Sequence, residues 1–276
     1  MIIDAHTHAF PDMLAERAIA ALREEVRSCG LDFPDTAYTD GTAGGLTGIM
    51  DKAGVDRCLL LPVATKPGQG KGINRWTAEF LKGGRIIPFG AIFPDGEYEE
   101  NLEKIARAGY KGVKIHGDYQ GFYADESRMI DFYRKCGELS LVVVMHSGVD
   151  PASPKEVHVD PVRMARVLDK VGGVTFVMAH MGGIGCEWEA SKLLKGSGVY
   201  VDTAYTAGRF SGEEIGELIR AFGADRVLFG SDCPWNDPSD DIALINSAGL
   251  SDKEREFIFS GNLGRLLKID AVPHTG

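Results

Sequence analysis

The sequence predicts an α/β fold of the (β/α)8 barrel type, also called a TIM barrel, as a single domain over residues 1–276. Eight short apolar, β-branched runs alternate with segments of helical periodicity, and from the second run onward they recur roughly every 25–33 residues, the length of one βα unit. The runs Leu141–Met145 and Val174–Ala179 are continuously apolar, as expected for strands buried on both faces. A chain of 276 residues is an ordinary length for one such barrel.

Each element follows from the same pattern. The predicted strands are Ile2–His6, Arg57–Pro62, Ile86–Phe93, Gly112–His116, Leu141–His146, Thr175–His180, Val199–Thr203 and Arg226–Gly230. The clearest helices between them are Asn101–Ala108, Ser127–Gly137, Pro161–Val171, Glu187–Lys195 and Gly212–Phe222. The main alternative is an open doubly wound sheet, but that fold usually has fewer strands and a glycine-rich first turn. Here the first strand ends in histidines instead.

The first βα unit is longer than the others. It contains a helix near Pro11–Cys29, a loop near Leu31–Gly45 and a second helix near Leu46–Gly54. This insertion would lie over the barrel mouth, either as a lid or as a plain surface loop. Gly68–Gly72 lacks the spacing of a phosphate-binding loop and is expected to form a mobile loop. Closing helices are predicted at Asp240–Ala248, Asp252–Phe259 and Gly261–Leu267, followed by a frayed end at Val272–Gly276.

Composition limits the classes of partner. The formal net charge is -10, which argues against nucleic acid, because phosphate binding needs clustered Lys and Arg. The five cysteines are scattered, as in a reduced intracellular chain. Neither a secretory signal nor an apolar run long enough to span a bilayer is visible. We therefore expect a cytoplasmic protein with a small-molecule partner, and the sequence leaves a homodimer open.

Histidine and aspartate side chains follow several of the predicted strands. His6 and His8 lie two residues apart at the end of the first strand, so they share a face. His146, His180 and Asp232 each come just after an apolar run. Barrel enzymes keep their catalytic groups at these strand ends, and imidazole with carboxylate suits a divalent metal. The set therefore predicts a metal site at the barrel mouth.

These motifs resemble the amidohydrolase superfamily, and in particular the branch that contains aminocarboxymuconate-semialdehyde decarboxylase, resorcylate decarboxylases and many metal-dependent hydrolases. The resemblance covers nearly the whole chain. The motifs that carry it are Asp4-Ala5-His6-Thr7-His8, Gly112-Val113-Lys114-Ile115-His116, Met145-His146-Ser147-Gly148, Ala179-His180-Met181-Gly182-Gly183, Phe229-Gly230-Ser231-Asp232-Cys233-Pro234-Trp235 and Gly261-Asn262-Leu263-Gly264-Arg265-Leu266-Leu267.

The resemblance implies that one divalent metal ion, with zinc preferred, is held by His6, His8, His146 and Asp232. It places His180 beside the metal-bound water or the substrate. A bound divalent ion lowers the pKa of its water from about 15.7 towards 7, and Asp232 is then positioned to act as general base.

Lys114 and Asp4 are the predicted supporting residues. Some superfamily members carry a carbamylated lysine on strand four that bridges two metals, so a second metal with a carbamylated Lys114 is an alternative. We favour a free amine, because the one-metal branch keeps its lysine unmodified. A buried amine is costly unless it is paired, so we expect Lys114 to pair with Asp4 or Asp232. By strand alternation, Asp4 would share the inward face with His6, beneath the metal.

The candidate substrate-binding residues are His116, Arg209, Tyr205 and Trp235. For His116, contact with the substrate and a structural role are equally compatible with the sequence. Arg209 is either a ligand for a substrate carboxylate or a solvated surface residue. Tyr205 and Trp235 either line the pocket or pack against neighbouring side chains. A thiol mechanism through Cys233 is not favoured. An activated cysteine needs a base or a positive neighbourhood, and the resemblance implies a variable residue at this position.

Hydrolysis of a small amide, ester or lactone by metal-activated water is the preferred function. The alternative is a non-oxidative decarboxylase, a carbon–carbon lyase, acting on a small aromatic or unsaturated carboxylic acid with the same metal site. A third interpretation, from a different class, is an inactive barrel that only binds a ligand.

Overall fold

Parallel strands form the centre of the molecule. The computed structural model describes residues 1–30, 36–153 and 156–269. In order, the strands are β1 (Ile3–Thr7), β2 (Arg57–Leu60), β3 (Ile86–Pro88), β4 (Gly90–Ala91), β5 (Gly112–Ile115), β6 (Val142–Met145), β7 (Phe176–Met178), β8 (Tyr200–Asp202) and β9 (Val227–Leu228). They pair in parallel as β1-β2-β3 and as β4 through β9 in sequence order. Each of the eight predicted strands overlaps at least one of these elements, and Ile86–Phe93 overlaps both β3 and β4.

Backbone hydrogen bonds join the two sheets into the predicted (β/α)8 barrel. β3 and β4 flank Phe89, whose N–H donates to the Leu60 carbonyl at 2.9 Å. Together they form one strand position of the barrel. At the other junction, the Ala5 N–H donates to Phe229 at 2.7 Å and the Asp232 N–H donates to His6 at 2.9 Å. The last strand is thereby joined to the first.

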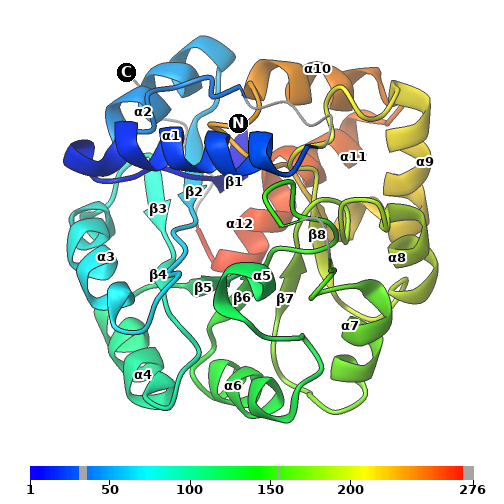
Figure 1. Ribbon diagram of the computed structural model, residues 1–276. Helices are drawn as coiled ribbons and strands as arrows, with labels where there is room; N and C mark the ends of the chain where they lie inside the picture. The colour runs from blue at the N-terminus through cyan, green and yellow to red at the C-terminus, as the bar shows by residue number, and fades with distance from the viewer. Residues whose placement is uncertain (31–35, 154–155, 270–276) are drawn as a thin grey trace.

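Helices surround the strands (Figure 1). They are α1 (Asp12–Ser28), α2 (Ala43–Ala53), α3 (Gln69–Thr77), α4 (Tyr98–Ala108), α5 (Gly117–Gln120), α6 (Ser127–Glu138), α7 (Pro161–Leu168), α8 (Glu187–Leu193), α9 (Gly212–Phe222), α10 (Pro238–Ser247), α11 (Asp252–Glu256) and α12 (Asn262–Leu267). Short helical turns lie at Ala78–Lys82, Ala224–Arg226 and Phe257–Gly261. Serine side chains cap α9 and α11 in capping boxes, which satisfies their first free N–H groups.

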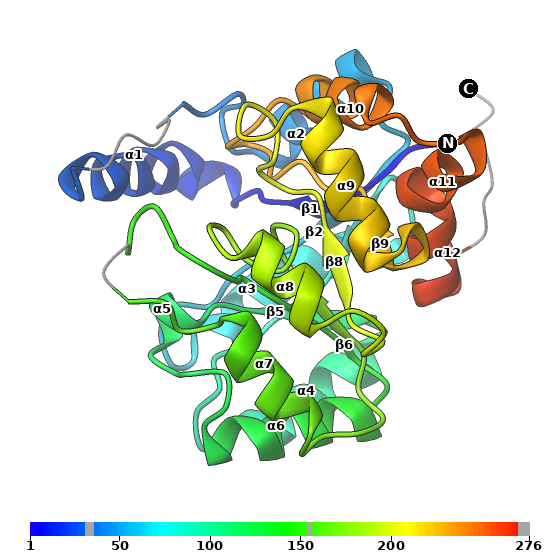
Figure 2. The same ribbon diagram turned by 90° about the vertical axis from the view of Figure 1, so that its right-hand side faces the viewer.

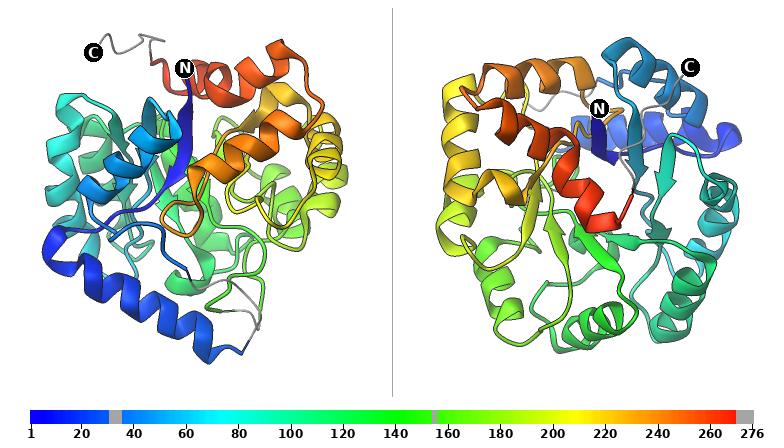
Figure 3. Two further views of the ribbon diagram at one scale, coloured as in Figure 1. Left: turned by 90° about the horizontal axis from the view of Figure 1, so that it is seen from above. Right: turned by 180° about the vertical axis from the view of Figure 1, so that it is seen from behind.

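The core divides at the strands into an inner and an outer part. On β6, Val142 and Val144 pack inside the barrel, whereas Val143 and Met145 pack against the helices. Two leucines of α12, Leu263 and Leu267, join the inner cluster, so α12 closes one end of the barrel. The views from the side and from behind show α12 at the end where the strands begin and α1 at the end where they finish (Figures 2 and 3). The open end therefore lies beneath the insertion, as the sequence predicted.

Some expectations were wrong or cannot be compared. Gly68–Gly72 does not form a loop: Gly68 has a φ of +75° and caps α3, which begins at Gln69. The Gln69 side chain accepts the N–H groups of Thr65 and Lys66, and Gly70 lies so close to the Ala91 carbonyl that a Cβ would be 2.6 Å from it. Residues 31–35 of the predicted loop and the predicted frayed end lie outside the described residues. No helix among the described residues combines the length and apolarity needed to cross a membrane.

Candidate functional site

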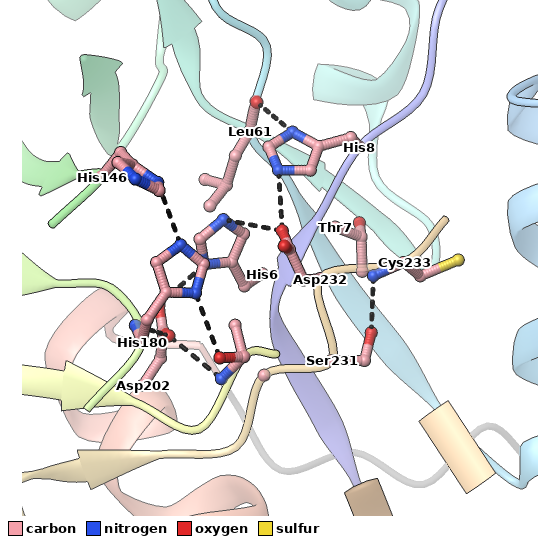
Figure 4. A network of polar contacts seen from close by, with 12 residues as sticks. His6, Thr7, His8, Leu61, His146, His180, Asp202, Ser231, Asp232 and Cys233 are labelled. Atoms are coloured by element: carbon pink, nitrogen blue, oxygen red, sulfur yellow. Dashed lines mark hydrogen bonds and ion pairs between the residues drawn. The ribbon is translucent and has the colours of Figure 1, made fainter. Parts of the chain in front are cut away.

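Histidine and aspartate side chains from the ends of several strands converge on one place (Figure 4). His6 lies on β1 and Asp202 ends β8. The others lie in the segments that follow β1, β6, β7 and β9: His8, His146, His180 and Asp232. Apart from His8, which is partly exposed, these residues are buried. Among them, His180 and Asp232 have φ angles of +60° and +72°, a region that non-glycine residues rarely adopt. Strain of this kind concentrates at functional sites.

Hydrogen bonds fix the tautomers of His6 and His8. The His8 Nδ1 lies 2.9 Å from the Leu61 carbonyl, which can only accept, so Nδ1 carries the proton. The His6 Nδ1 lies 2.8 Å from Asp202 Oδ2 and is a donor for the same reason. In the neutral rings both Nε2 atoms therefore carry lone pairs, and they lie 3.4 Å (His6) and 3.1 Å (His8) from the same oxygen, Asp232 Oδ1. Three acceptors facing one another call for a cation between them.

His180 and His146 form a second tautomer chain. The His180 Nδ1 is 3.0 Å from the Ala204 carbonyl, so Nδ1 carries the proton and donates it. In the neutral ring, Nε2 therefore carries a lone pair. That Nε2 is 3.1 Å from His146 Nδ1, which must then donate. The remaining nitrogen of His146, Nε2, is buried without a hydrogen-bond partner among the described residues. An unpaired imidazole lone pair fits a metal ligand. The ligand atoms of His6, His8 and Asp232 lie within 4.8 Å of one another, whereas the group of this kind that includes His146 is formed with His116 and Asp118.

The two carboxylates of the site are held in the charged form. Burial opposes the ionisation of Asp232, but the neighbouring side chains of His6, His8 and His180 outweigh it and lower its pKa to about 2. Asp202 is fully buried, yet His6, His180 and Lys114 hold its pKa well below the usual range. Burial lowers the pKa of His6 to about 4 and also lowers that of His146 and His180. Neutral imidazoles beside ionised carboxylates are the donor set that a divalent cation requires.

Lys114 does not make the carboxylate pair that the sequence suggested. It is 1% exposed and its Nζ lies 3.0 Å from His6 Nε2, the lone pair described above. Among the described residues, this amine forms an ion pair with no carboxylate. Burial lowers the pKa of Lys114 to about 8, against the attraction of Asp202, Asp232 and Asp150.

Asp4 has a different task. Its carboxylate accepts the Ser231 hydroxyl at 2.6 Å and the N–H groups of Ser231 and His6, each at 3.0 Å. The pairing of β1 with β2 shifts register between Asp4 and Thr7, and Ile3 and Ala5 occupy the barrel interior. Strict alternation therefore fails on this strand, and Asp4 supports the backbone next to Asp232 instead of facing Lys114.

A second polar cluster lies beside the first. The His116 Nε2 is 3.1 Å from Asp150 Oδ2, and the Tyr119 hydroxyl donates to the other oxygen of Asp150 at 3.2 Å. The rings of His116 and His146 stack with centroids 4.1 Å apart and an angle of 8°. In-plane lone pairs of parallel rings do not converge, so these two histidines are poorly arranged to share one ion. His158 contacts Asp118 at 2.9 Å in the same region.

The remaining predicted residues lie at the rim. Arg209 forms an ion pair with the buried Glu187 and donates to the Tyr205 carbonyl at 3.3 Å. Tyr205 is buried with a φ of +60°, and burial raises its pKa to about 12. The Trp235 N–H donates to the Asp232 carbonyl at 2.9 Å. Their roles toward a substrate stay predictions. Burial raises the pKa of the Cys233 thiol, which disfavours the thiolate that a thiol mechanism needs.

Sequence reasoning missed Asp202 and Asp150. Asp202 accepts from His6 Nδ1 and from the N–H groups of His180 and Ala204, the latter two at 2.8 and 3.1 Å. The sequence contained a pattern that could have identified Asp202: it directly follows the apolar run Val199–Val201, just as His146 directly follows its own strand. Asp150 gave no such signal, since it lies in a loop beyond β6.

Comparison with known proteins agrees with this architecture. The most similar structures include a TIM-barrel protein from Bordetella bronchiseptica described as uncharacterized (19% identity, TM-score 0.77, 97% of this chain and 98% of that one). A dihydroxybenzoic acid decarboxylase from Polaromonas sp. JS666, solved with manganese and the inhibitor 2-nitroresorcinol, has 18% identity and a TM-score of 0.71, with 98% of each chain covered. A 5-carboxyvanillate decarboxylase from Sphingomonas paucimobilis has 15% identity and a TM-score of 0.69, over 98% of this chain and 99% of that one. At these identities the likeness establishes the fold.

The sequence itself settles the family. No curated protein matches the chain, but the family model described as amidohydrolase matches residues 3–269. That span contains every strand of the barrel and all of the converging histidines and aspartates. The chain belongs to the amidohydrolase family.

Proposed function

We propose that this protein is a metal-dependent, non-oxidative decarboxylase of a small hydroxylated aromatic or unsaturated carboxylic acid. The observation that carries metal dependence is the convergence of the His6 and His8 lone pairs on one oxygen of Asp232. The choice of decarboxylation is supported by the similar structures named for that activity, one of which binds manganese and a resorcinol inhibitor.

His6, His8 and Asp232 would hold one divalent ion, with His146 as the fourth ligand. When bound, the ion would supply positive charge to a carboxylate or hydroxyl oxygen of the substrate. Zinc remains the metal we favour from the imidazole-rich donor set, and manganese is the alternative that the similar structures suggest. A two-metal centre is disfavoured, because Lys114 as a free amine already contacts His6.

The protein's own residues account for the rest of the reaction. The bond between the carboxyl carbon and its neighbour breaks, carbon dioxide leaves without the bonding electrons, and the carbon that keeps them takes up a proton. In this proposal Asp232 and His180 carry that proton. The buried surroundings of His180 and Lys114 exclude water, which favours the conversion of a charged carboxylate into neutral carbon dioxide.

Hydrolysis of a small amide, ester or lactone is the second candidate. The name of the matching family model favours it, and it would use the same residues, with Asp232 as general base. A barrel that only binds a ligand is less compatible with two histidines and an ionised aspartate assembled in one strained site.

The test is a paired screen of the purified protein loaded with zinc or with manganese. Hydroxybenzoates and related acids are assayed for carbon dioxide release, and lactones, esters and amides are assayed for hydrolysis. We expect release of carbon dioxide that requires the metal. Turnover confined to the second panel would replace the proposal by the hydrolase, and inactivity toward both panels would count against either enzyme.

The metal content is tested separately by elemental analysis. We expect about one divalent ion per chain in the wild type and a clear loss in His146→Ala. The matched control is His158→Ala, which removes a histidine that contacts Asp118 outside the proposed ligand set. Equal metal content in the three proteins would refute the assignment of His146 as a ligand.

A further inference from the structure

Lys114 occupies the position from which a metal ion would bind His6. Asp202 holds the proton of His6 on Nδ1, so Nε2 carries one lone pair and can only accept a hydrogen bond or bind a cation. In the structure that lone pair accepts a hydrogen bond from Lys114 Nζ at 3.0 Å. A lone pair that accepts this hydrogen bond is not available to a metal ion, and the reverse also holds.

The surroundings explain why a cation is needed there. Asp202 and Asp232 are both ionised and buried, and Asp232 Oδ1 lies 3.4 Å from His6 Nε2. Buried carboxylates without a compensating charge destabilise a fold. The charge of Lys114 acts on both of these carboxylates, and the side chain reaches the site from β5, on the far side of the barrel from β1.

We propose that Lys114 is an internal competitor of the metal: its ammonium group takes the place of the cation in the metal-free protein and must leave His6 Nε2 when the metal binds. This inference rests on the proposed metal site, but it concerns how the empty site is held together and how tightly it binds metal. It does not depend on the reaction catalysed. It also differs from a lysine that contributes to metal binding as a carbamate, because that lysine would strengthen metal binding.

The experiment compares wild type with Lys114→Met, which keeps the length of the side chain and removes the donor and the charge. Lys111→Met is the matched control, since Lys111 is exposed and lies just before the same strand. Metal affinity is measured by competition with a chromophoric chelator, and the melting temperatures of the metal-free and metal-loaded forms are measured in parallel. Mass spectrometry of the wild type determines whether Lys114 carries a carbamate.

We expect Lys114→Met to bind the metal at least tenfold more tightly than wild type and Lys111→Met. We also expect its metal-free form to melt at a lower temperature, and metal to raise its melting temperature by more than it raises that of wild type. Unchanged or weaker metal binding, or a carbamate on Lys114, would overturn the inference while leaving the metal site standing. A wild type that binds no divalent metal at all would overturn both.

A second measurement covers the case in which Lys114→Met does not fold. Crystal structures of the wild type with and without metal report the distance between Lys114 Nζ and His6 Nε2 directly. The inference requires the contact of 3.0 Å to be present without metal and lost with it. An amine that keeps the contact in the metal-loaded protein would refute the competition.

Discussion

Asp202 decides whether His6 can bind a metal at all, and Asp202→Asn tests this. One oxygen of Asp202 accepts the N–H groups of His180 and Ala204, so the oxygen of the new amide stays at that position. The amide nitrogen then lies where Oδ2 was, 2.8 Å from His6 Nδ1. Two donors would face each other, and the His6 proton would move to Nε2, which removes the lone pair from the metal site.

The size of the effect follows from the interaction that is lost. A hydrogen bond to a charged group contributes roughly 1.5–3 kcal/mol, and loss of a residue that orients a metal-bound histidine typically costs 10–100-fold in affinity, or about 1.4–2.8 kcal/mol. We therefore expect Asp202→Asn to bind zinc or manganese 10–100-fold more weakly in a chelator competition assay. The control is Asp241→Asn: this aspartate is also fully buried, contacts Ala207 and Asn236, and has its pKa raised by burial. Equal metal affinity in Asp202→Asn and Asp241→Asn would refute the tautomer argument.

Three other predictions concern the same centre. Asp232→Asn should keep the melting temperature of the metal-free protein within a few degrees but lose at least a hundredfold in kcat on whichever substrate the screen identifies, since an amide neither carries the proton nor balances the cation; near wild-type kcat would place the base elsewhere. In the metal-free protein, the contribution of His6 to stability should fall with pH, because the pKa of His6 is about 4 when folded and 6.5 when unfolded: this contribution of about 3 kcal/mol is complete above pH 6.5 and disappears toward pH 4. Burial raises the pKa of Asp4 to about 7, which changes stability in the opposite direction over the same interval, so the His6 contribution is measured as the difference in urea unfolding between wild type and His6→Asn. An equal pH dependence in the two proteins contradicts it. Gly230→Ala would place a methyl group 3.0 Å from His6 Cβ, so it should weaken metal binding several-fold in the same chelator assay, whereas Gly264→Ala, with its nearest neighbour at 3.5 Å, should not.

Strand order and barrel type were predictable because they depend on patterns that lie close together in the sequence. The apolar run Val142–Met145 ends at His146 whatever the rest of the chain does, and helix α9 begins at Gly212 directly after its Ser211 cap, as predicted. Gly68–Gly72 could not be assigned in this way. Its helix depends on the close approach of Gly70 to the Ala91 carbonyl of a neighbouring strand, a contact between segments that no local pattern contains.

The candidate site was also predictable only in part. The positions of His6, His8 and Asp232 follow from strand ends, but the roles of the two histidines depend on which ring nitrogen carries the proton. That is set by the Leu61 carbonyl for His8 and by Asp202 for His6, partners 53 and 196 residues away. The orientation of Asp4 failed for a related reason, because alternation along β1 is broken by a register shift that only the pairing with β2 reveals.

Asp202 and Lys114 act on the same lone pair from opposite directions, which makes their combination informative. Asp202 creates the lone pair on His6 Nε2, and Lys114 occupies it. Asp202→Asn should therefore weaken metal binding, and Lys114→Met should strengthen it. In the double variant the gain from Lys114→Met should vanish, because competition for a lone pair has no effect once the proton sits there. Independent sites would give additive changes in binding free energy. A chelator titration of the four proteins measures the difference, and strict additivity would show that Lys114 acts on the metal through its charge alone and not through His6.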